Sequence, residues 1–224
     1  MNILAIETTG PVAAAAIVCK DRVAAEFAIN NKLTHSQVLM SLIDSMFKAA
    51  DFDKTDIDFI ACSAGPGSFT GLRIGAAAAK GLAFGLSRKI VPVSTLDALA
   101  YNIAGGEGFQ IAPIMDARRN QVYTALYQKT NDGINRLTDY MACDFDELVS
   151  LAQESGVSTM FLGDGVAVHR DKIINMENFA IAPLGFLHQR VAAVGAVALN
   201  TTSTAIASED FAPFYIRGSQ ADGG

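Results

Sequence analysis

The hydrophobic pattern of the chain begins with short apolar runs and continues with a segment of helical spacing. Residues 3–7, 12–19 and 23–29 are apolar runs separated by turn residues, which predicts a β-meander of three strands. In residues 34–50 apolar positions recur every three or four residues, which predicts an amphipathic helix with one wide buried stripe. The chain therefore begins with three strands followed by a helix.

Residues 57–86 predict a strand, a tight turn and a second helix. The apolar run at 57–64 is typical of a buried strand, and Gly65-Pro66-Gly67 ends it because glycine permits positive φ and proline fixes the turn. Ser68 or Thr70 then caps a helix that is rich in glycine and alanine. Each interior glycine costs a helix about 1 kcal/mol relative to alanine. This composition predicts that another backbone approaches the helix closely.

A glycine-rich turn before a helix can also bind an anion, because free backbone N–H groups and the helix dipole meet there. The stretch lacks the G-x-x-x-x-G-K-[ST] spacing of a P-loop and has no lysine to reach phosphates. On these residues alone, a tight turn with close packing is favoured over a phosphate cradle.

The opening pattern recurs in the second half of the chain. Residues 111–116 are apolar and end in an acid, a polar turn follows, and residues 121–127 predict a second strand, as residues 3–19 do. The echo predicts an α/β protein with duplicated lobes, each with a β-meander followed by alternating helices and strands. A glycine cluster at 104–108 predicts the lobe boundary.

We therefore expect an N-terminal lobe at residues 1–104 and a C-terminal lobe at 105–217. A helix at 187–200 is expected to pack back on the first lobe, and residues 218–224 are expected to form a disordered tail.

Composition narrows the function classes. The 224 residues carry 17 Lys and Arg against 23 Asp and Glu, a formal charge of −6, which does not suggest a large basic surface for nucleic acid. Three distant cysteines favour buried thiols of a reducing compartment over disulfides. No apolar run approaches the ~18 residues that span a bilayer, and no signal peptide is evident, so we expect a cytoplasmic protein.

Two acids end equivalent strands of the predicted lobes. Glu7 is followed by Thr8, and Asp116 by Ala117 and two arginines. In an actin-like kinase fold, such positions face a magnesium nucleotide between the lobes. Asp116 lacks the following glycine that would let backbone amides approach phosphates, and the glycines around Asp164 fit a plain turn as well as an adenosine contact. Glu7, Thr8, Asp116 and Gly163 are therefore weak cofactor-binding candidates.

The histidine and serine positions give little support to a metal site or to a hydrolase triad. His35 has Leu39 at the i+4 position where a helical metal pair needs a second histidine, so no metal site is predicted. Ser63, Ser68, His35 and Asp97 could form a triad only by coincidence, because no G-x-S-x-G elbow is present. A glycoprotease-like peptidase remains a weaker hypothesis.

Six segments together resemble the TsaB (YeaZ) family over nearly the whole chain. They are MNILAIETT, THSQVLM, SAGPGSFTGLRIG, MDARRNQVY, GDG and PFYIR. The resemblance implies a two-lobed actin-like ATPase (ASKHA) fold and a protein without catalytic residues or cofactors of its own. It implies a scaffold and activator of the complex that transfers threonylcarbamoyl to N6 of adenosine 37 in tRNAs reading ANN codons. The alternative is an enzyme that binds and hydrolyses ATP in its own interlobe cleft.

The resemblance also implies partners and a contact surface. The partners are a TsaD-like catalytic subunit and a TsaE-like ATPase, with homodimerisation when the partner is absent, tRNA contact only through the complex, and no membrane contact. Pairing in the family buries the helices that correspond here to residues 33–50 and 70–86. The implied partner-binding residues are Leu39, Leu42, Ile43, Met46, Gly71, Leu72, Gly75, Ala76, Ala79, Leu82 and Ala83.

Overall fold

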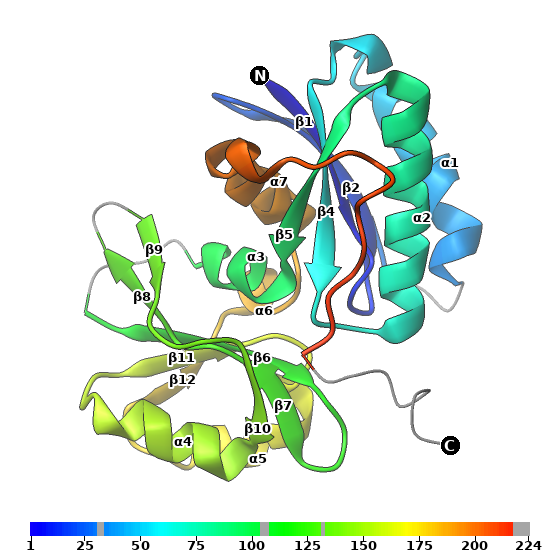
Figure 1. Cartoon of the computed structure of the whole chain (residues 1–224). Helices are drawn as coiled ribbons and strands as arrows, with labels where there is room; N and C mark the ends of the chain where they lie inside the picture. The colour runs from blue at the N-terminus through cyan, green and yellow to red at the C-terminus, as the bar shows by residue number, and fades with distance from the viewer. Residues whose placement is uncertain (31–33, 104–107, 131–132, 217–224) are drawn as a thin grey trace. The chain divides into compact units, whose positions relative to one another are not determined.

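Figure 1 shows the computed structural model of the chain, which describes residues 1–30, 34–103, 108–130 and 133–216. The chain forms two compact units. Unit 1 consists of Met1–Ala98 and Gln189–Phe214, and unit 2 consists of Leu99–His188 with Tyr215 and Ile216. Unit 1 is therefore built from two segments that are far apart in the sequence.

The sheet of unit 1 has five strands in the order β3-β2-β1-β4-β5. β1 pairs with β2 and β2 with β3 in antiparallel fashion, whereas β1, β4 and β5 are parallel neighbours. The antiparallel part is the predicted meander. The strands are β1 Asn2–Glu7, β2 Ala13–Cys19, β3 Val23–Ile29, β4 Phe59–Gly65 and β5 Lys89–Ser94.

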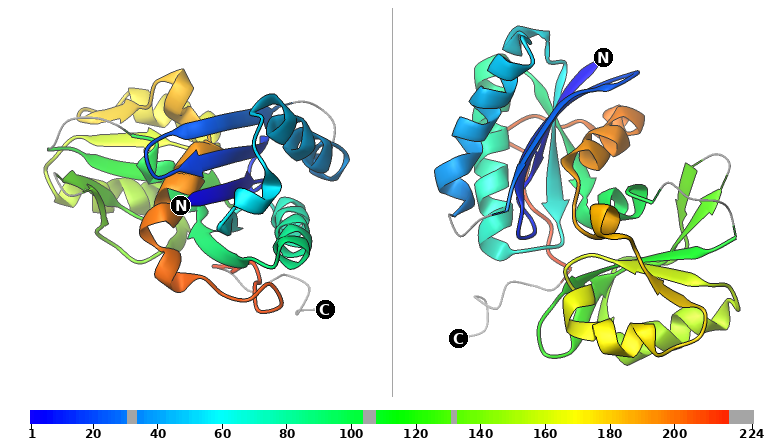
Figure 2. Two further views of the ribbon diagram at one scale, coloured as in Figure 1. Left: turned by 90° about the horizontal axis from the view of Figure 1, so that it is seen from above. Right: turned by 180° about the vertical axis from the view of Figure 1, so that it is seen from behind.

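Helices cover both faces of this sheet (Figure 2). Leu4 and Ile6 of β1 belong to the core shared with α1 and α2, whereas Ile3 and Ala5 belong to the core shared with α7. Because each side of β1 and β2 is buried, these strands are apolar at consecutive positions. The helical segments are α1 His35–Ala49, η1 Lys54–Asp56, α2 Phe69–Leu86, α3 Thr95–Tyr101, α7 Val191–Asn200 and η2 Thr202–Thr204.

Side-chain caps fix where α1 and α2 begin. The side chain of Gln37 accepts a hydrogen bond from the backbone N–H of Thr34 at 3.1 Å, which is half of a capping box. Ser68, rather than Thr70, caps α2, because its hydroxyl accepts from the N–H of Gly71 at 3.3 Å. Within the described ranges, no helix is both long and apolar enough to cross a membrane.

Unit 2 repeats the strand order of unit 1. Its main sheet has the order β10-β7-β6-β11-β12, so that in each unit the first strand lies between the second and the fourth. The hairpin β8–β9 is an addition that pairs with β6. The elements are β6 Gln110–Asp116, β7 Gln121–Thr124, β8 Tyr127–Thr130, β9 Gly133–Arg136, β10 Met141–Asp144, α4 Phe145–Glu154, β11 Thr159–Leu162, α5 Val166–Ile174, β12 Phe179–Ile181 and α6 Leu184–Leu187.

The unit boundaries differ from those expected. The chain leaves unit 1 after Ala98, not at 104/105, and returns to it at Gln189, so the lobe expected at 105–217 loses its last part to unit 1. The physical reason is that α7 covers the second face of the first sheet, where Val191 and Val194 are buried. The expected boundary at 104/105 and the tail at 218–224 lie outside the described residues.

Two smaller expectations are also corrected. The strand expected at 121–127 is divided into β7 and β8, and β8 turns away to pair with β9. The helix expected at 187–200 begins at Val191, because residues up to Leu187 form the separate short helix α6.

Candidate functional site

The end of β1 holds a buried carboxyl group. Glu7 is fully buried; the backbone N–H and the hydroxyl of Thr9 donate hydrogen bonds to its Oε1, and the hydroxyl of Ser63 donates to its Oε2. Burial raises the pKa of the Glu7 carboxyl, and these hydrogen bonds oppose the shift. Both carboxyl oxygens are thus engaged inside unit 1, where Glu7 joins the ends of β1 and β4.

The turn after β4 is packed against backbone. Gly65 has a φ of 126°, and a Cβ added there would lie 2.4 Å from the carbonyl oxygen of Phe214. A Cβ added at Gly67 would lie 2.6 Å from the Cβ of Thr9, whose carbonyl accepts from the N–H of Ser68 at 2.8 Å. The turn therefore needs its glycines for close approach within the chain, as the residue pattern predicts.

The glycines of α2 divide into two faces. A Cβ added at Gly71 would lie 2.0 Å from the carbonyl oxygen of Thr8, and one at Gly75 would lie 2.4 Å from the Thr8 hydroxyl. That hydroxyl donates to the carbonyl of Gly71 at 2.8 Å. Nothing lies within 4 Å of a Cβ added at Gly81 or Gly85. Gly71 and Gly75 have no room for a side chain because Thr8, directly after β1, packs against them. Gly81 and Gly85 face open space.

The residues expected to bind a partner lie mostly inside unit 1. Ten of the eleven predicted partner-binding residues are buried in unit 1, and Leu82 is half-buried. The wide apolar stripe of α1 and the inner face of α2 pack on the sheet, so their side chains hold the helices in place. The buried residues are Leu39, Leu42, Ile43, Met46, Gly71, Leu72, Gly75, Ala76, Ala79 and Ala83.

The exposed side of the same helix is a stripe of aromatic and small residues. Phe84 is 81% exposed and Phe69 is 43% exposed, with the guanidinium of Arg73 stacked 3.9 Å from the Phe69 ring. On α1, Met40 is also half exposed. Exposed residues at spacings of three or four identify one side, which we call the outer face of α2: Phe69, Arg73, Ala77, Gly81, Phe84 and Gly85.

The residues considered for a nucleophilic triad have separate roles. Ser63 is bonded to the buried carboxyl, Ser68 caps α2, and Nε2 of His35 lies 2.9 Å from the carbonyl oxygen of Gly10. Asp97 lies in the first turn of α3. The contacts of the two serines and the histidine thus join each to a different group, and they do not form a nucleophile–base pair.

In unit 2, the weak candidate Asp116 ends β6, and the weak candidate Gly163 directly follows the neighbouring strand β11. The N–H of Asp116 donates to Oδ1 of Asp164 at 3.1 Å, and burial raises the pKa of the Asp164 carboxyl. A Cβ added at Gly163 would lie 2.2 Å from the carbonyl oxygen of Ile114. The sequence pattern fits a plain turn or an adenosine contact at Asp164 and gives no sign of its hydrogen bond with Asp116; the glycines on either side of Asp164 are the one local signal of a close approach.

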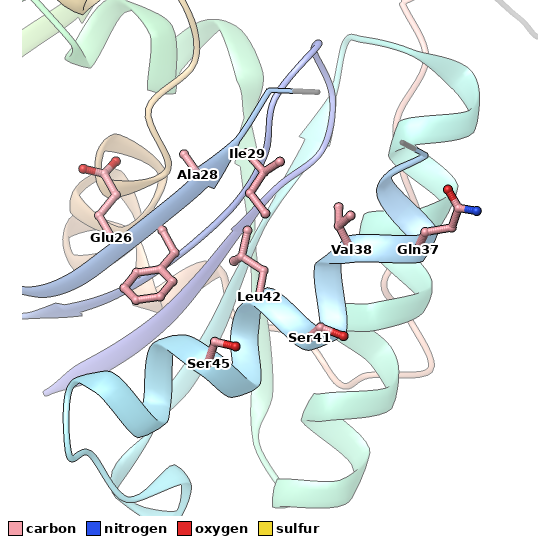
Figure 3. A pocket seen from close by; sticks show the side chains of 9 residues that line it. Glu26, Ala28, Ile29, Gln37, Val38, Ser41, Leu42 and Ser45 are labelled. Atoms are coloured by element: carbon pink, nitrogen blue, oxygen red, sulfur yellow. The ribbon is translucent and has the colours of Figure 1, made fainter. Parts of the chain in front are cut away.

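A groove of about 490 Å³ lies between the edge strand β3 and α1 (Figure 3). Apolar side chains of both elements line it, with the carboxyl of Glu26 at one end. Its lining residues are Glu26, Phe27, Ala28, Ile29, Gln37, Val38, Ser41, Leu42 and Ser45. Within the part of the chain that the structure describes, no group of three or more His, Cys, Asp or Glu residues is arranged to hold a metal ion.

Comparison with known proteins identifies the family. Residues 23–222 match the sequence model of TsaD, the tRNA N6-adenosine threonylcarbamoyltransferase. The chain is 36% identical over 173 residues to the tRNA threonylcarbamoyladenosine biosynthesis protein TsaB of Bacillus subtilis, a match that covers 77% of this chain and 75% of that protein. The chain belongs to the TsaB (YeaZ) family. The TsaB of Escherichia coli is 35% identical over 135 residues, 60% of this chain and 58% of that protein.

Two solved structures are similar to this chain in fold. YeaZ from Pseudomonas aeruginosa has 23% sequence identity and a TM-score of 0.77, covering 96% of this chain and 99% of that one. The activator of 2-hydroxyisocaproyl-CoA dehydratase from Clostridium difficile, solved with bound ADPNP, has a TM-score of 0.51 at 11% identity and covers 91% and 98%. The predicted family and the actin-like ATPase fold are confirmed, and the TsaD match agrees with the expected paralogy.

Proposed function

We propose that this TsaB-family chain acts in tRNA threonylcarbamoyladenosine biosynthesis as a non-catalytic subunit that scaffolds and activates a TsaD-type transferase. The observation that carries the proposal is the 36% identity to Bacillus subtilis TsaB over 77% of the chain. The reaction supported is transfer of threonylcarbamoyl to N6 of adenosine 37 in tRNAs reading ANN codons, in the cytoplasm. A TsaE-type ATPase is the third component of the complex, and this chain contacts tRNA only as part of that complex.

The buried carboxyl of Glu7 supports the non-catalytic role. A catalytic or metal-binding carboxylate needs at least one oxygen that can reach substrate or ion. Thr9 and Ser63 occupy both oxygens of Glu7, which is fully buried. Likewise, the hydroxyl of Thr8 donates a hydrogen bond to the carbonyl of Gly71 in α2. The residues that end β1 thus serve the internal packing of unit 1.

The outer face of α2 is the surface we assign to the TsaD-type partner. Phe84 carries most of its ring in solvent at 81% exposure, and Gly81 and Gly85 leave room for a partner helix to approach closely. Because the partner is a paralogue, two copies of this chain can use the same face when the partner is absent. The proposed surface keeps the helix predicted from the sequence and moves the contact to its other side.

Pairing is tested with outer-face variants of the full chain. Phe84→Asp and Gly81→Arg are expected to weaken association with the purified TsaD-type subunit at least tenfold in a calorimetric titration, and to abolish homodimers in sedimentation. Val168→Asp on α5, also exposed (59%) and apolar, is the matched control and should bind as the parent does. Unchanged association of both outer-face variants, with native circular dichroism, would refute this surface.

The activating role has its own test. In a reconstituted reaction, the chain should raise the rate of tRNA modification by the TsaD-type subunit, and Glu7→Gln and Asp116→Asn should retain that effect because neither residue touches substrate. The nucleotide-hydrolysing alternative predicts heat on titration of the isolated chain with Mg-ATP and loss of hydrolysis in both variants. Turnover of ATP by the isolated chain would replace the scaffold proposal.

A further inference from the structure

The turn between β6 and β7 is built from three consecutive left-handed residues. Arg118, Arg119 and Asn120 have φ angles of 66°, 54° and 63°. Asparagine adopts this conformation readily, but a long side chain does so rarely because its Cβ crowds the carbonyl oxygen. Glycine would remove the strain at both arginine positions. Arginine at two positions of positive φ, where glycine would be unstrained, points to a use for the two side chains.

Hydrogen bonds hold the turn in this conformation. The N–H of Ala117 donates to the carbonyl of Gln121, and the N–H of Gln121 donates to the carbonyl of Arg118, both at 3.0 Å. The carbonyl of Asn120 accepts from the first residue of α4 at 3.2 Å. The backbone is therefore fixed at both ends of the turn, and the arginine side chains are presented from a rigid support.

Both guanidinium groups face solvent. The Arg118 side chain is 87% exposed and lies 3.5 Å from the Asp116 carboxylate, an exposed ion pair that contributes little. Arg119 is exposed and forms no ion pair with any described residue. Residues 116–144 contain four basic and four acidic residues, in a chain whose formal charge is −6. Arg118 and Arg119 are thus two adjacent cations at the tip of the turn, in a segment without net charge.

We propose that Arg118 and Arg119 bind phosphate groups of the tRNA backbone. This inference rests on the proposed function, which brings tRNA to the complex. The planar guanidinium donates two parallel hydrogen bonds to a phosphate, and backbone contacts of this kind position RNA without reading its sequence.

A docked protein fits the turn less well. Specific protein contacts centre on buried apolar or aromatic anchors. Among the described residues of 117–143, one large hydrophobic side chain, Leu137, is exposed, and none is exposed in the turn itself at 117–121. The surface offers charge and hydrogen-bond donors, which is the chemistry that a phosphate backbone requires.

The experiment measures binding of a fluorescent tRNA transcript to the reconstituted complex at several salt concentrations. In the double variant Arg118→Ala/Arg119→Ala, Kd is expected to rise about tenfold, since each lost contact is a hydrogen bond to a charged group. The slope of log affinity against log salt should fall by about 1.4 to 1.8 for two phosphates. The double lysine variant should keep most of the slope, and Arg170→Ala, an exposed arginine of α5, is the control.

A second variant separates binding from folding. Arg118→Gly/Arg119→Gly should raise the melting temperature of the chain, because the strain is relieved, while losing tRNA affinity as the alanine variant does. Unchanged Kd and salt slope in both variants would overturn the proposal. A loss of TsaD-type association with tRNA affinity unchanged would instead assign the turn to a protein contact and also overturn it.

Failure of this inference and failure of the proposed function give different results. If the complex modifies tRNA faster with the chain and the turn variants bind tRNA normally, only the phosphate contact fails. If the chain does not accelerate modification, the activating role fails, and the binding titration still reports whether the arginines touch RNA.

Discussion

Replacing glycine by alanine is expected to change the free energy of unfolding in opposite directions at two positions of α2. Gly71→Ala is expected to lower the free energy of unfolding of unit 1, whereas Gly81→Ala, ten residues further along the helix, is expected to raise it. The difference lies in what an added methyl group meets: the carbonyl oxygen of Thr8 at 2.0 Å in the first case and open space in the second.

The magnitudes follow from three contributions. At Gly71, the helix must move until the contact lengthens from 2.0 Å to the ordinary 3.4 Å, and overpacking of this kind costs about 1–3 kcal/mol. The same movement weakens the hydrogen bond from the Thr8 hydroxyl, worth about 1 kcal/mol. Alanine returns about 1 kcal/mol of helix propensity at either site. Gly71→Ala should therefore lose about 1–3 kcal/mol, and Gly81→Ala should gain about 1 kcal/mol.

Urea unfolding followed by far-ultraviolet circular dichroism measures both changes in the free energy of unfolding. In a thermal melt, Gly81→Ala should raise the melting temperature by about 2–4 °C, given the size of the chain. Equal effects of the two substitutions would refute the division of α2 into an inner face packed on β1 and an open outer face. A neutral Gly71→Ala alone would show that α2 and the end of β1 separate at little cost.

Four further substitutions test groups at three positions: Glu7 and His169, which are buried, and Glu26, which is half-buried. The pKa of Glu7 is raised in the folded chain, so the stability it contributes declines as pH rises above 4.5 through the folded pKa; Glu7→Gln should remove that decline in unfolding titrations between pH 5 and 8. His169 is stacked on Phe145 at 4.0 Å, and burial lowers its pKa, so stability should fall as pH drops below 6.5, a dependence that His169→Leu should abolish in melts at pH 7.5 and 5.5. Glu26→Ala should lower the free energy of unfolding by about 1–2 kcal/mol, with Glu26→Gln less affected, because Oε1 of Glu26 accepts from the N–H of Ala192 and caps α7.

The elements of the first sheet were predictable because their signals are local. The apolar runs around Asn2–Glu7 and Ala13–Cys19, the spacing in α1, and the turn at Gly65 all lie within a few residues of the structure they specify. The echo between two hairpins predicted a duplicated β-meander but gave no strand order. The path of the chain after Leu187 was only partly predictable, because α7 is apolar on all sides and its place depends on a sheet that is distant in sequence.

The candidate surface was harder to predict for a different physical reason. On α2, both faces carry small residues, so periodicity shows a helix but does not show which side meets the sheet. Gly71 and Gly75 pack closely against Thr8, whereas Gly81 faces open space. All three are glycine in the sequence, so residue type alone does not separate the two faces. The contact between Asp116 and Asp164 joins two strands that are distant in sequence, and no local pattern encodes that proximity.

The return of residues 189–214 to unit 1 has a consequence for synthesis on the ribosome. When residue 98 has been made, the five strands and both helices of one face exist, but α7 does not. Ile3, Ala5 and Val18 therefore lack their cover until another 102 residues, from 99 to the end of α7 at Asn200, have been added. At about 5–20 residues per second, that interval lasts roughly 5–20 seconds. During this time the nascent sheet carries a finished helical layer on one side and bare apolar surface on the other.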